Sequence, residues 1–123
     1  MMINLLRWCI RIAWLAALVW GLLIWSGRLA GTLNLHIILG EIVAAALAIL
    51  AVYALLARVR IALASSALAW AAVTVYVGVM QRRWMPGGSH WMIETVHLLL
   101  GVGAIGMAEA LAGAVTRGTK SPG

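Results

Sequence analysis

Residues 33–57 read LNLHIILGEIVAAALAILAVYALLA, an apolar run that carries one histidine, His36, and one carboxylate, Glu41. About 20 helical residues cross the roughly 30 Å hydrocarbon core of a bilayer, so this run is long enough to span a membrane. The run does not alternate with a period of two, as a barrel strand would. Because a chain in lipid must satisfy its backbone hydrogen bonds internally, the run predicts a transmembrane helix.

Three further apolar runs, separated by short connections, accompany this one. They cover residues 8–26, 61–81 and 90–115. Short connections make consecutive helices antiparallel. We therefore predict an all-α, integral membrane protein: a four-helix up-down-up-down bundle that forms a single domain over residues 1–123. The polar tail at 116–123 is expected to fray.

The composition excludes several classes of protein. The chain has 123 residues, of which 65% are hydrophobic and 10% charged, and its mean hydropathy is +1.06. Soluble domains are about 45–50% apolar and about 25% charged. A soluble globular protein, a disordered chain and a nucleic-acid binder are thus excluded, and the lipid bilayer is the expected partner. The single cysteine, Cys9, excludes an internal disulfide and a cysteine-based zinc site.

Basic residues are distributed unevenly between the two ends of the predicted bundle. The chain carries nine Lys and Arg against three acidic residues. Six of the basic residues fall on the side that holds both termini: Arg7, Arg11, Arg58, Arg60, Arg117 and Lys120. The opposite side holds three: Arg28, Arg82 and Arg83. Because positive loops remain in the cytoplasm, both termini are expected to be cytoplasmic.

One motif occurs twice, 61 positions apart. His36 is followed by Gly40 in HIILG, and His97 is followed by Gly101 in HLLLG. The two segments belong to helices that run in the same direction. The depths of the two histidines are expected to differ by about 6–8 Å, which lies within the error of the helix boundaries and the tilt of the helices. No matching echo links residues 8–26 with 61–81.

This pair of motifs suits a flat macrocycle held between two helices. Imidazole is an axial ligand of haem iron, and a glycine one turn away leaves room for the ring. His36 and His97 are therefore the candidate metal ligands, with Gly40 and Gly101 in the cofactor-binding set. The alternative is that each histidine only hydrogen-bonds a neighbouring helix.

His90 and Arg28 belong to the side of the bundle opposite the termini, and are expected to contact a cofactor there. Haem propionates are anionic and would point to this basic rim. Further candidates on the rim are Arg82, Arg83, Ser89 and Trp91. The alternative for His90 is a solvated histidine at the membrane interface.

All three acidic residues fall within predicted helices, where a carboxylate costs at least about 2–3 kcal/mol. Glu41 is expected to face another helix rather than the gap between the histidines. Glu94 could accept a bond from a ligand or from His90, and Glu109 could pair with an arginine. Glu94 and His97 form a single E-x-x-H string, which is too little for a di-iron site. A zinc or iron site built from His36, His97, Glu94 and His90 stays open.

The four-helix pattern with His36 and His97 resembles small membrane b-type cytochromes, both the cytochrome b561-like proteins and the membrane anchors of respiratory dehydrogenases. Residues 90–101, HWMIETVHLLLG, also resemble a segment of small bacterial membrane proteins. The resemblance implies one haem b with two histidine ligands, electron transfer to or from quinone or a redox partner, and a place in the bacterial inner membrane. Many such cytochromes hold two haems with four histidines, whereas only two are well placed here.

Other functions remain open at this point. The chain could be a non-catalytic accessory subunit of a larger redox or photosynthetic complex, where His36 and His97 could ligate chlorophyll magnesium. It could form a homo-oligomer. A small transporter matches the length and helix count, but the multidrug exporters of this size rely on an acid in the first helix, and residues 8–26 contain none.

Overall fold

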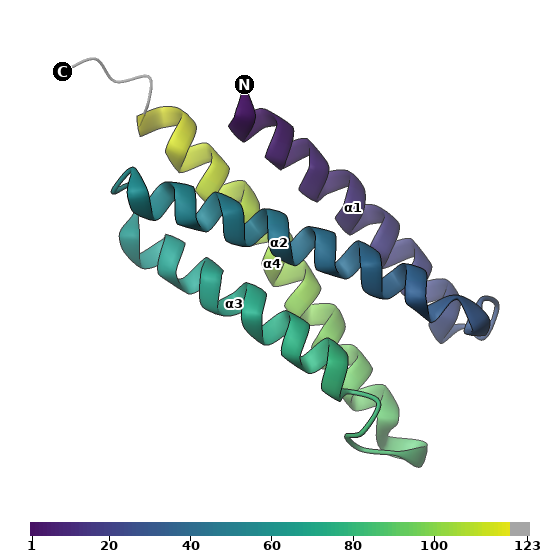
Figure 1. Ribbon diagram of the computed structural model, residues 1–123. Helices are drawn as coiled ribbons and strands as arrows, with labels where there is room; N and C mark the ends of the chain where they lie inside the picture. Colours follow the sequence, from purple (N-terminus) through teal and green to yellow (C-terminus); the bar gives the residue numbers. More distant parts are fainter. Residues whose placement is uncertain (119–123) are drawn as a thin grey trace.

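The computed structural model describes residues 1–118, and four long helices account for most of them (Figure 1). They are α1 (Met2–Trp25), α2 (Leu33–Leu56), α3 (Ile61–Met80) and α4 (His90–Gly118). Each is long and apolar enough to cross a membrane. The predicted all-α, four-helix architecture is thus confirmed, and the chain is an integral membrane protein by the length and composition of its helices.

Two helix boundaries differ from those expected from sequence. α1 begins at Met2 rather than near residue 8, because the first 20 residues contain no glycine or proline that would delay it. α4 continues to Gly118, so residues 116–118, expected to fray, are helical. Arg117 lies in this last turn, where a positive charge interacts favourably with the helix dipole. The remaining part of the expected polar tail, residues 119–123, lies outside the described residues.

The helices are arranged so that α2 and α4 form the central pair (Figure 1). α1 and α3 each contact both of these helices, and α2 contacts α4 directly. Over residues 1–118, α1 and α3 do not contact each other. The two helices that carry the histidine motifs are therefore adjacent. Both begin at the end of the bundle that holds the α1–α2 connection and the α3–α4 connection, called the 1–2 and 3–4 connections below.

The half of the bundle near the chain termini is closely packed. Its core consists of alanines with a few larger aliphatic side chains, of which the fully buried ones are Ile10, Leu47, Leu50, Leu111 and Val115. Small residues let helix backbones approach closely, and this packing replaces the hydrophobic effect as the source of helix association in lipid. This half holds the four helices together.

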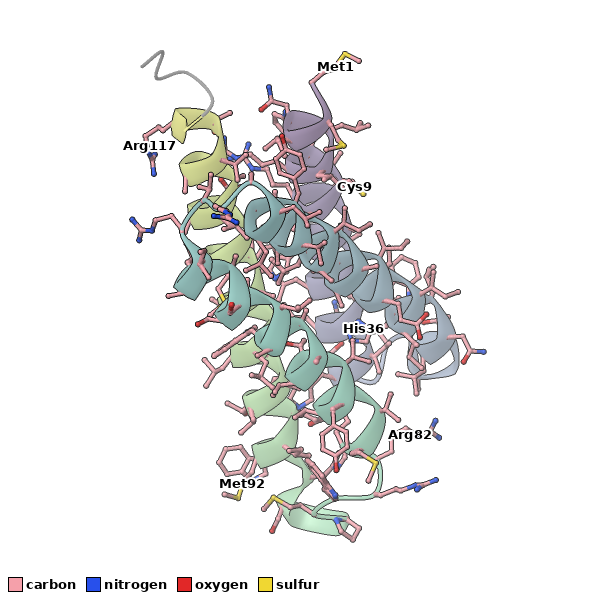
Figure 2. The ribbon with its side chains drawn as sticks, turned by 60° about the vertical axis from the view of Figure 1, so that its left-hand side comes forward. Met1, Cys9, His36, Arg82, Met92 and Arg117 are labelled. Atoms are coloured by element: carbon pink, nitrogen blue, oxygen red, sulfur yellow. The ribbon has the colours of Figure 1, made fainter. Side chains whose placement is uncertain are left out.

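The other half of the bundle is open. The α1–α2 hairpin and the α3–α4 hairpin diverge toward their connecting loops, as both ribbon views show (Figures 1 and 2). Few side chains are fully buried there, and on α3 and α4 the last buried positions toward the loops are Val77 and Ile93. The divergence leaves a cavity between the two hairpins.

The connections are short and hydrogen-bonded. Between α2 and α3, Arg58 has a φ of 53°, and Val59 N–H donates to the carbonyl of Ala54 at 2.9 Å. This left-handed closing turn ends the helix in the way glycine more often does. Between α1 and α2, Trp20 Nε1 donates to Thr32 Oγ1 at 2.9 Å. The 1–2 connection is thereby fixed to the body of α1.

Candidate functional site

The cavity between the hairpins has a volume of about 280 Å³ and is lined by all four helices. Apolar side chains form most of its wall. The polar groups that reach it include His36, His97, Gln81, Arg82, His90 and Glu94. Pockets with apolar walls and a few converging polar groups are the usual form of a small-molecule or cofactor site.

His36 and His97 lie beside each other in this cavity. Their ring centroids are 6.2 Å apart, and the ring planes are inclined at 74°. His36 is the fourth residue of α2 and His97 the eighth of α4. The two helices cross at an angle (Figure 1), which offsets this difference in starting position. The structure thus brings together the two histidines that the repeated motif singled out.

Each of the two imidazoles rests on a glycine of the preceding helix. A β-carbon on Gly21 of α1 would stand 2.9 Å from His36 Cε1, and one on Gly78 of α3 would stand 2.9 Å from His97 Cε1. Real β-carbons do not approach other atoms this closely. The absence of a side chain at both glycines is therefore what allows the rings to lie where they do.

The hydrogen bonding of the two histidines differs. His36 Nδ1 lies 3.0 Å from the carbonyl oxygen of Ala17. Because a carbonyl can only accept, Nδ1 carries the proton in the neutral ring, and Nε2 keeps its lone pair. His97 Nδ1 is buried, and among residues 1–118 it has no hydrogen-bond partner. One ring is thus held by a hydrogen bond and the other by packing alone.

Two tryptophans bind the α4 backbone next to the cavity. Trp14 Nε1 donates to the Gly101 carbonyl, and Trp70 Nε1 donates to the Leu100 carbonyl, both at 2.8 Å. Trp70 also lies on Gly103, where a β-carbon would stand 2.4 Å from Cζ2. The indoles therefore connect α1 and α3 to α4, one turn below His97.

The mouth of the cavity carries its charged groups. Arg82 and His90 both line it, and His90 Nε2 lies 3.9 Å from Glu94 Oε1. Gln81 Oε1 is buried there and, within the described part of the chain, has no hydrogen-bond partner. Arg28, also expected at this site, is exposed on the 1–2 connection and does not line the cavity.

The predicted glycines occupy different surroundings. Gly40 lines the cavity, and a β-carbon there would meet no atom within 4 Å. Gly101 also lines it, and a β-carbon there would stand 3.9 Å from Trp14 Nε1. The space expected beside the histidines is therefore present, although Gly21 and Gly78 are the glycines that touch the imidazoles.

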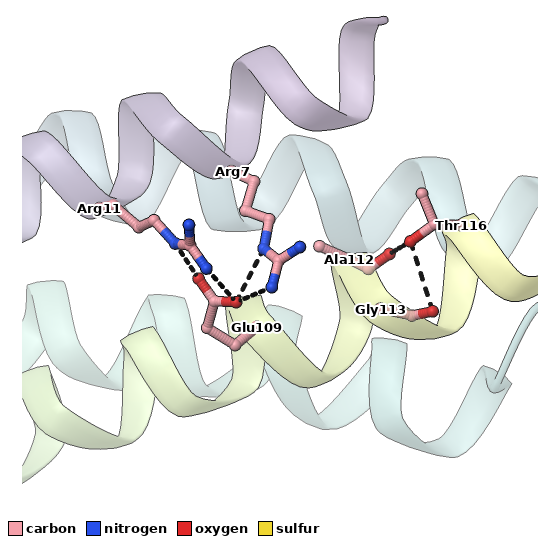
Figure 3. A network of polar contacts seen from close by, with 6 residues as sticks. All are labelled: Arg7, Arg11, Glu109, Ala112, Gly113 and Thr116. Carbon is pink, nitrogen blue, oxygen red and sulfur yellow. Dashed lines mark hydrogen bonds and ion pairs between the residues drawn. The ribbon is translucent and has the colours of Figure 1, made fainter.

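The other two carboxylates lie away from the cavity. Glu41 is exposed on the outer surface of α2, so the expectation that it faces another helix of this chain is wrong. Its place on the helix turns it away from the neighbours of α2. Glu109 pairs with both Arg7 and Arg11 of α1 (Figure 3). The alternative that Glu109 pairs with an arginine is therefore confirmed.

The described part of the chain forms no site for a bare metal ion. Across residues 1–118, no three His, Cys, Asp or Glu side chains are grouped so that they could hold an ion. The structure therefore gives no support to a zinc or iron site from His36, His97, Glu94 and His90. His36 and His97 remain beside each other as a pair of imidazoles.

The two imidazoles and their surroundings have the chemistry that a haem would require. His36 and His97 would hold it, because an imidazole nitrogen binds haem iron and the two rings lie in one cavity with centroids 6.2 Å apart. Within residues 1–118, His97 Nδ1 and Gln81 Oε1 are buried polar atoms that have no hydrogen-bond partner. Apolar walls and a cationic mouth suit a macrocycle with anionic substituents.

Sequence reasoning missed the contribution of α1 and α3. Gly21 on α1 has a counterpart in Gly78 on α3, since each lies against a histidine of the following helix, and each follows a tryptophan, Trp14 or Trp70, although both indoles donate to α4. The spacing differs by one residue, seven in α1 and eight in α3. A search at the fixed 61-residue offset could not find this pair, whereas a search for tryptophan followed two turns later by glycine could.

The fold and the cavity define the chain as a four-helix integral membrane protein with a paired-histidine cavity between its two hairpins. No family model matches the chain, and neither a curated protein nor a solved structure matches it.

Proposed function

We propose that the protein is a membrane b-type cytochrome that holds one haem b between α2 and α4. His36 and His97 would be the two residues that hold the haem iron. The single observation that carries this proposal is the placement of two imidazoles from different helices, 6.2 Å apart, inside one apolar cavity. Bound haem would supply one-electron transfer.

The residues of the chain contribute binding and orientation. The Ala17 carbonyl accepts a hydrogen bond from the Nδ1–H group of His36. The Nε2 atom then carries the lone pair with which an imidazole binds a metal. Gly21 and Gly78 allow the two rings to lie close to the backbones of α1 and α3. Arg82 at the mouth offers a cation to an anionic substituent. The apolar walls keep water from the ligand pair.

The position of the cavity favours a partner on one side of the membrane. It opens toward the α1–α2 and α3–α4 connections, and the Lys and Arg bias favours a position outside the cytoplasm for these connections. Electron exchange with a quinone or with a larger redox complex would take place there. We propose the bacterial inner membrane as the location, with both termini cytoplasmic.

The proposal is tested by the dithionite-reduced minus oxidised absorption spectrum of the protein purified in detergent, followed by a pyridine haemochrome assay. We expect a sharp α band and a shifted Soret band. His36→Ala and His97→Ala should each abolish or severely weaken haem binding, since each removes one axial ligand. His90→Ala should leave binding intact and is the matched control.

Full retention of haem in both ligand variants would overturn the assignment of His36 and His97. A featureless spectrum, with no haem recovered after supplementation, would overturn the cytochrome proposal as a whole. Function would then be sought in an accessory subunit or a transporter. A chlorophyll spectrum would instead identify a pigment-binding subunit.

A further inference from the structure

A cluster of three charges lies at the opposite end of the bundle from the cavity, between α1 and α4 (Figure 3). Arg7 Nε donates to Glu109 Oε2 at 2.7 Å, and Arg7 Nη2 donates to the same oxygen. Arg11 Nε donates to Oε1 at 2.5 Å, and Arg11 Nη2 donates to Oε2 at 3.0 Å. Both carboxylate oxygens of Glu109 are thus engaged by two guanidinium groups.

The cluster carries a net charge of +1, because two guanidinium groups share one carboxylate. The chain has only two other acidic side chains. Glu94 lies beside His90 at the far end of the bundle, and Glu41 is exposed on α2. Over residues 1–118, no second carboxylate pairs with Arg7 or Arg11, so one positive charge has no counter-charge in this part of the chain.

This charge lies within an apolar helix. Arg7 and Arg11 are about 8 and 14 Å along α1 from its start, at 1.5 Å per residue. Their side chains are 33% and 37% exposed on the outer surface. An uncompensated charge within a membrane span is costly, and it is satisfied by pairing or by reaching the headgroups. An anion would therefore neutralise the net charge of the cluster, and the exposed side of the two arginines leaves room for it to approach.

A neighbouring tryptophan marks the level of the lipid headgroups. Trp8 is exposed, and the guanidinium carbon of Arg11 lies 5.0 Å from the centroid of its ring. Tryptophan concentrates where the hydrocarbon meets the headgroups. The cluster thus lies at a depth where a phosphate group of a lipid is available.

We propose that Arg7 and Arg11 form a binding site for one phosphate anion, with Glu109 as the group that holds both guanidinium planes in place. Each guanidinium uses its Nε and Nη2 on Glu109. Its Nη1 group keeps donors directed elsewhere, and arginine binds phosphate through such paired donors. An anionic phospholipid and free phosphate both offer this chemistry. The site is independent of haem binding.

The test uses the full chain in detergent, titrated with phosphatidylglycerol, with zwitterionic phosphatidylcholine, or with inorganic phosphate. Native mass spectrometry counts the bound lipid, and thermal unfolding reports stabilisation. We expect one phosphatidylglycerol to bind at concentrations at which phosphatidylcholine does not. If inorganic phosphate stabilises the protein as much as phosphatidylglycerol does, the ligand is free phosphate. If inorganic phosphate does not stabilise the protein, the ligand is the lipid.

Three variants separate the cluster from general surface charge. Arg11→Gln leaves Arg7 paired with Glu109, makes the cluster neutral, and should weaken phosphatidylglycerol binding by about fivefold or more, since a basic residue at a lipid surface contributes about 1 kcal/mol. Arg117→Gln removes an exposed charge at the same end and should leave binding unchanged. Glu109→Gln raises the cluster to +2 but releases both guanidinium planes, and it should weaken binding; stronger binding would overturn the positioning role of Glu109.

Equal binding of phosphatidylglycerol and phosphatidylcholine by the unmodified chain would overturn the proposal. So would an identical loss in Arg11→Gln and Arg117→Gln, because the effect would then come from total charge. Each variant is first shown to unfold in one thermal transition, and Arg7→Gln, which also leaves one guanidinium on Glu109, replaces Arg11→Gln if the latter does not fold.

Discussion

His36 lies on Gly21 so closely that a β-carbon at this glycine would stand 2.9 Å from the imidazole Cε1. The same relationship holds between His97 and Gly78 in the other hairpin, also at 2.9 Å. The position of each histidine ring is therefore set by a residue on the preceding helix, in addition to its own. This makes the two glycines positioning residues for the two imidazoles.

Gly21→Ala and Gly78→Ala should each displace the imidazole without unfolding the bundle, because the clashing atom is the far end of a side chain that can move. If haem binds as proposed, its affinity should fall by about 10–100-fold, the range for groups that orient metal ligands. Haem titration followed by the Soret band measures this. Gly106→Ala, which adds a methyl group in open space on α4, is the control and should keep the affinity unchanged.

Gly103→Ala should destabilise the protein by about 1–3 kcal/mol, the usual cost of overpacking. A β-carbon there would stand 2.4 Å from Trp70 Cζ2, and the ring cannot retreat without losing its hydrogen bond to the Leu100 carbonyl. Unfolding in detergent monitored by circular dichroism gives the difference. Gly106→Ala should be neutral or slightly stabilising, since alanine favours a helix over glycine. Equal stability of the two variants would contradict the close contact.

Trp14→Phe should cost about 0.5–1.5 kcal/mol, the net contribution of one hydrogen bond. The phenyl ring keeps most of the packing but removes the donor to the Gly101 carbonyl. The same unfolding measurement applies. Trp25→Phe is the matched control, because Trp25 is exposed and its indole makes no hydrogen bond to any of residues 1–118. A loss of the same size in both variants would show that packing, and not the hydrogen bond, is responsible.

Both termini should be on the cytoplasmic side of the membrane, because six of the nine Lys and Arg belong to that side of the bundle. A fluorescent protein fused to the C-terminus should fluoresce, and alkaline phosphatase fused there should be inactive. Fusions within the 3–4 connection should give the opposite pattern. An active phosphatase at the C-terminus would reverse the orientation and place the cavity mouth toward the cytoplasm.

The sequence predicted the four helices because length and apolarity decide whether a segment spans a bilayer. It also singled out His36 and His97, because histidine is rare in this chain and the two motifs match in type and spacing. Helix ends were less accurate, since polar residues such as Arg7 can still be helical. The contacts of His36 with Gly21 and of His97 with Gly78 depend on which faces of neighbouring helices meet, and a linear sequence pattern does not contain that information.

Glu41 and Arg28 illustrate the same limit. Angular position on a helix indicated that Glu41 points away from His36, but not that nothing in this chain covers it. Arg28 lies on the correct side of the bundle, but the 1–2 connection directs it outward while Arg82 lines the cavity. Side-chain placement at loops follows from their detailed hydrogen bonding, such as the bond of Trp20 to Thr32.

The contrast between a filled half and a hollow half has a mechanical consequence for each helix. Stiffness must change along a single helix, because close packing surrounds it near the chain termini and open space adjoins it near the loops. Backbone amides around Leu50 and Leu111 should therefore exchange with deuterium slowly, while those around His36 and Val79 exchange faster. Any molecule that joins the two hairpins across the cavity would remove this gradient, so its disappearance would report occupancy without any knowledge of what is bound.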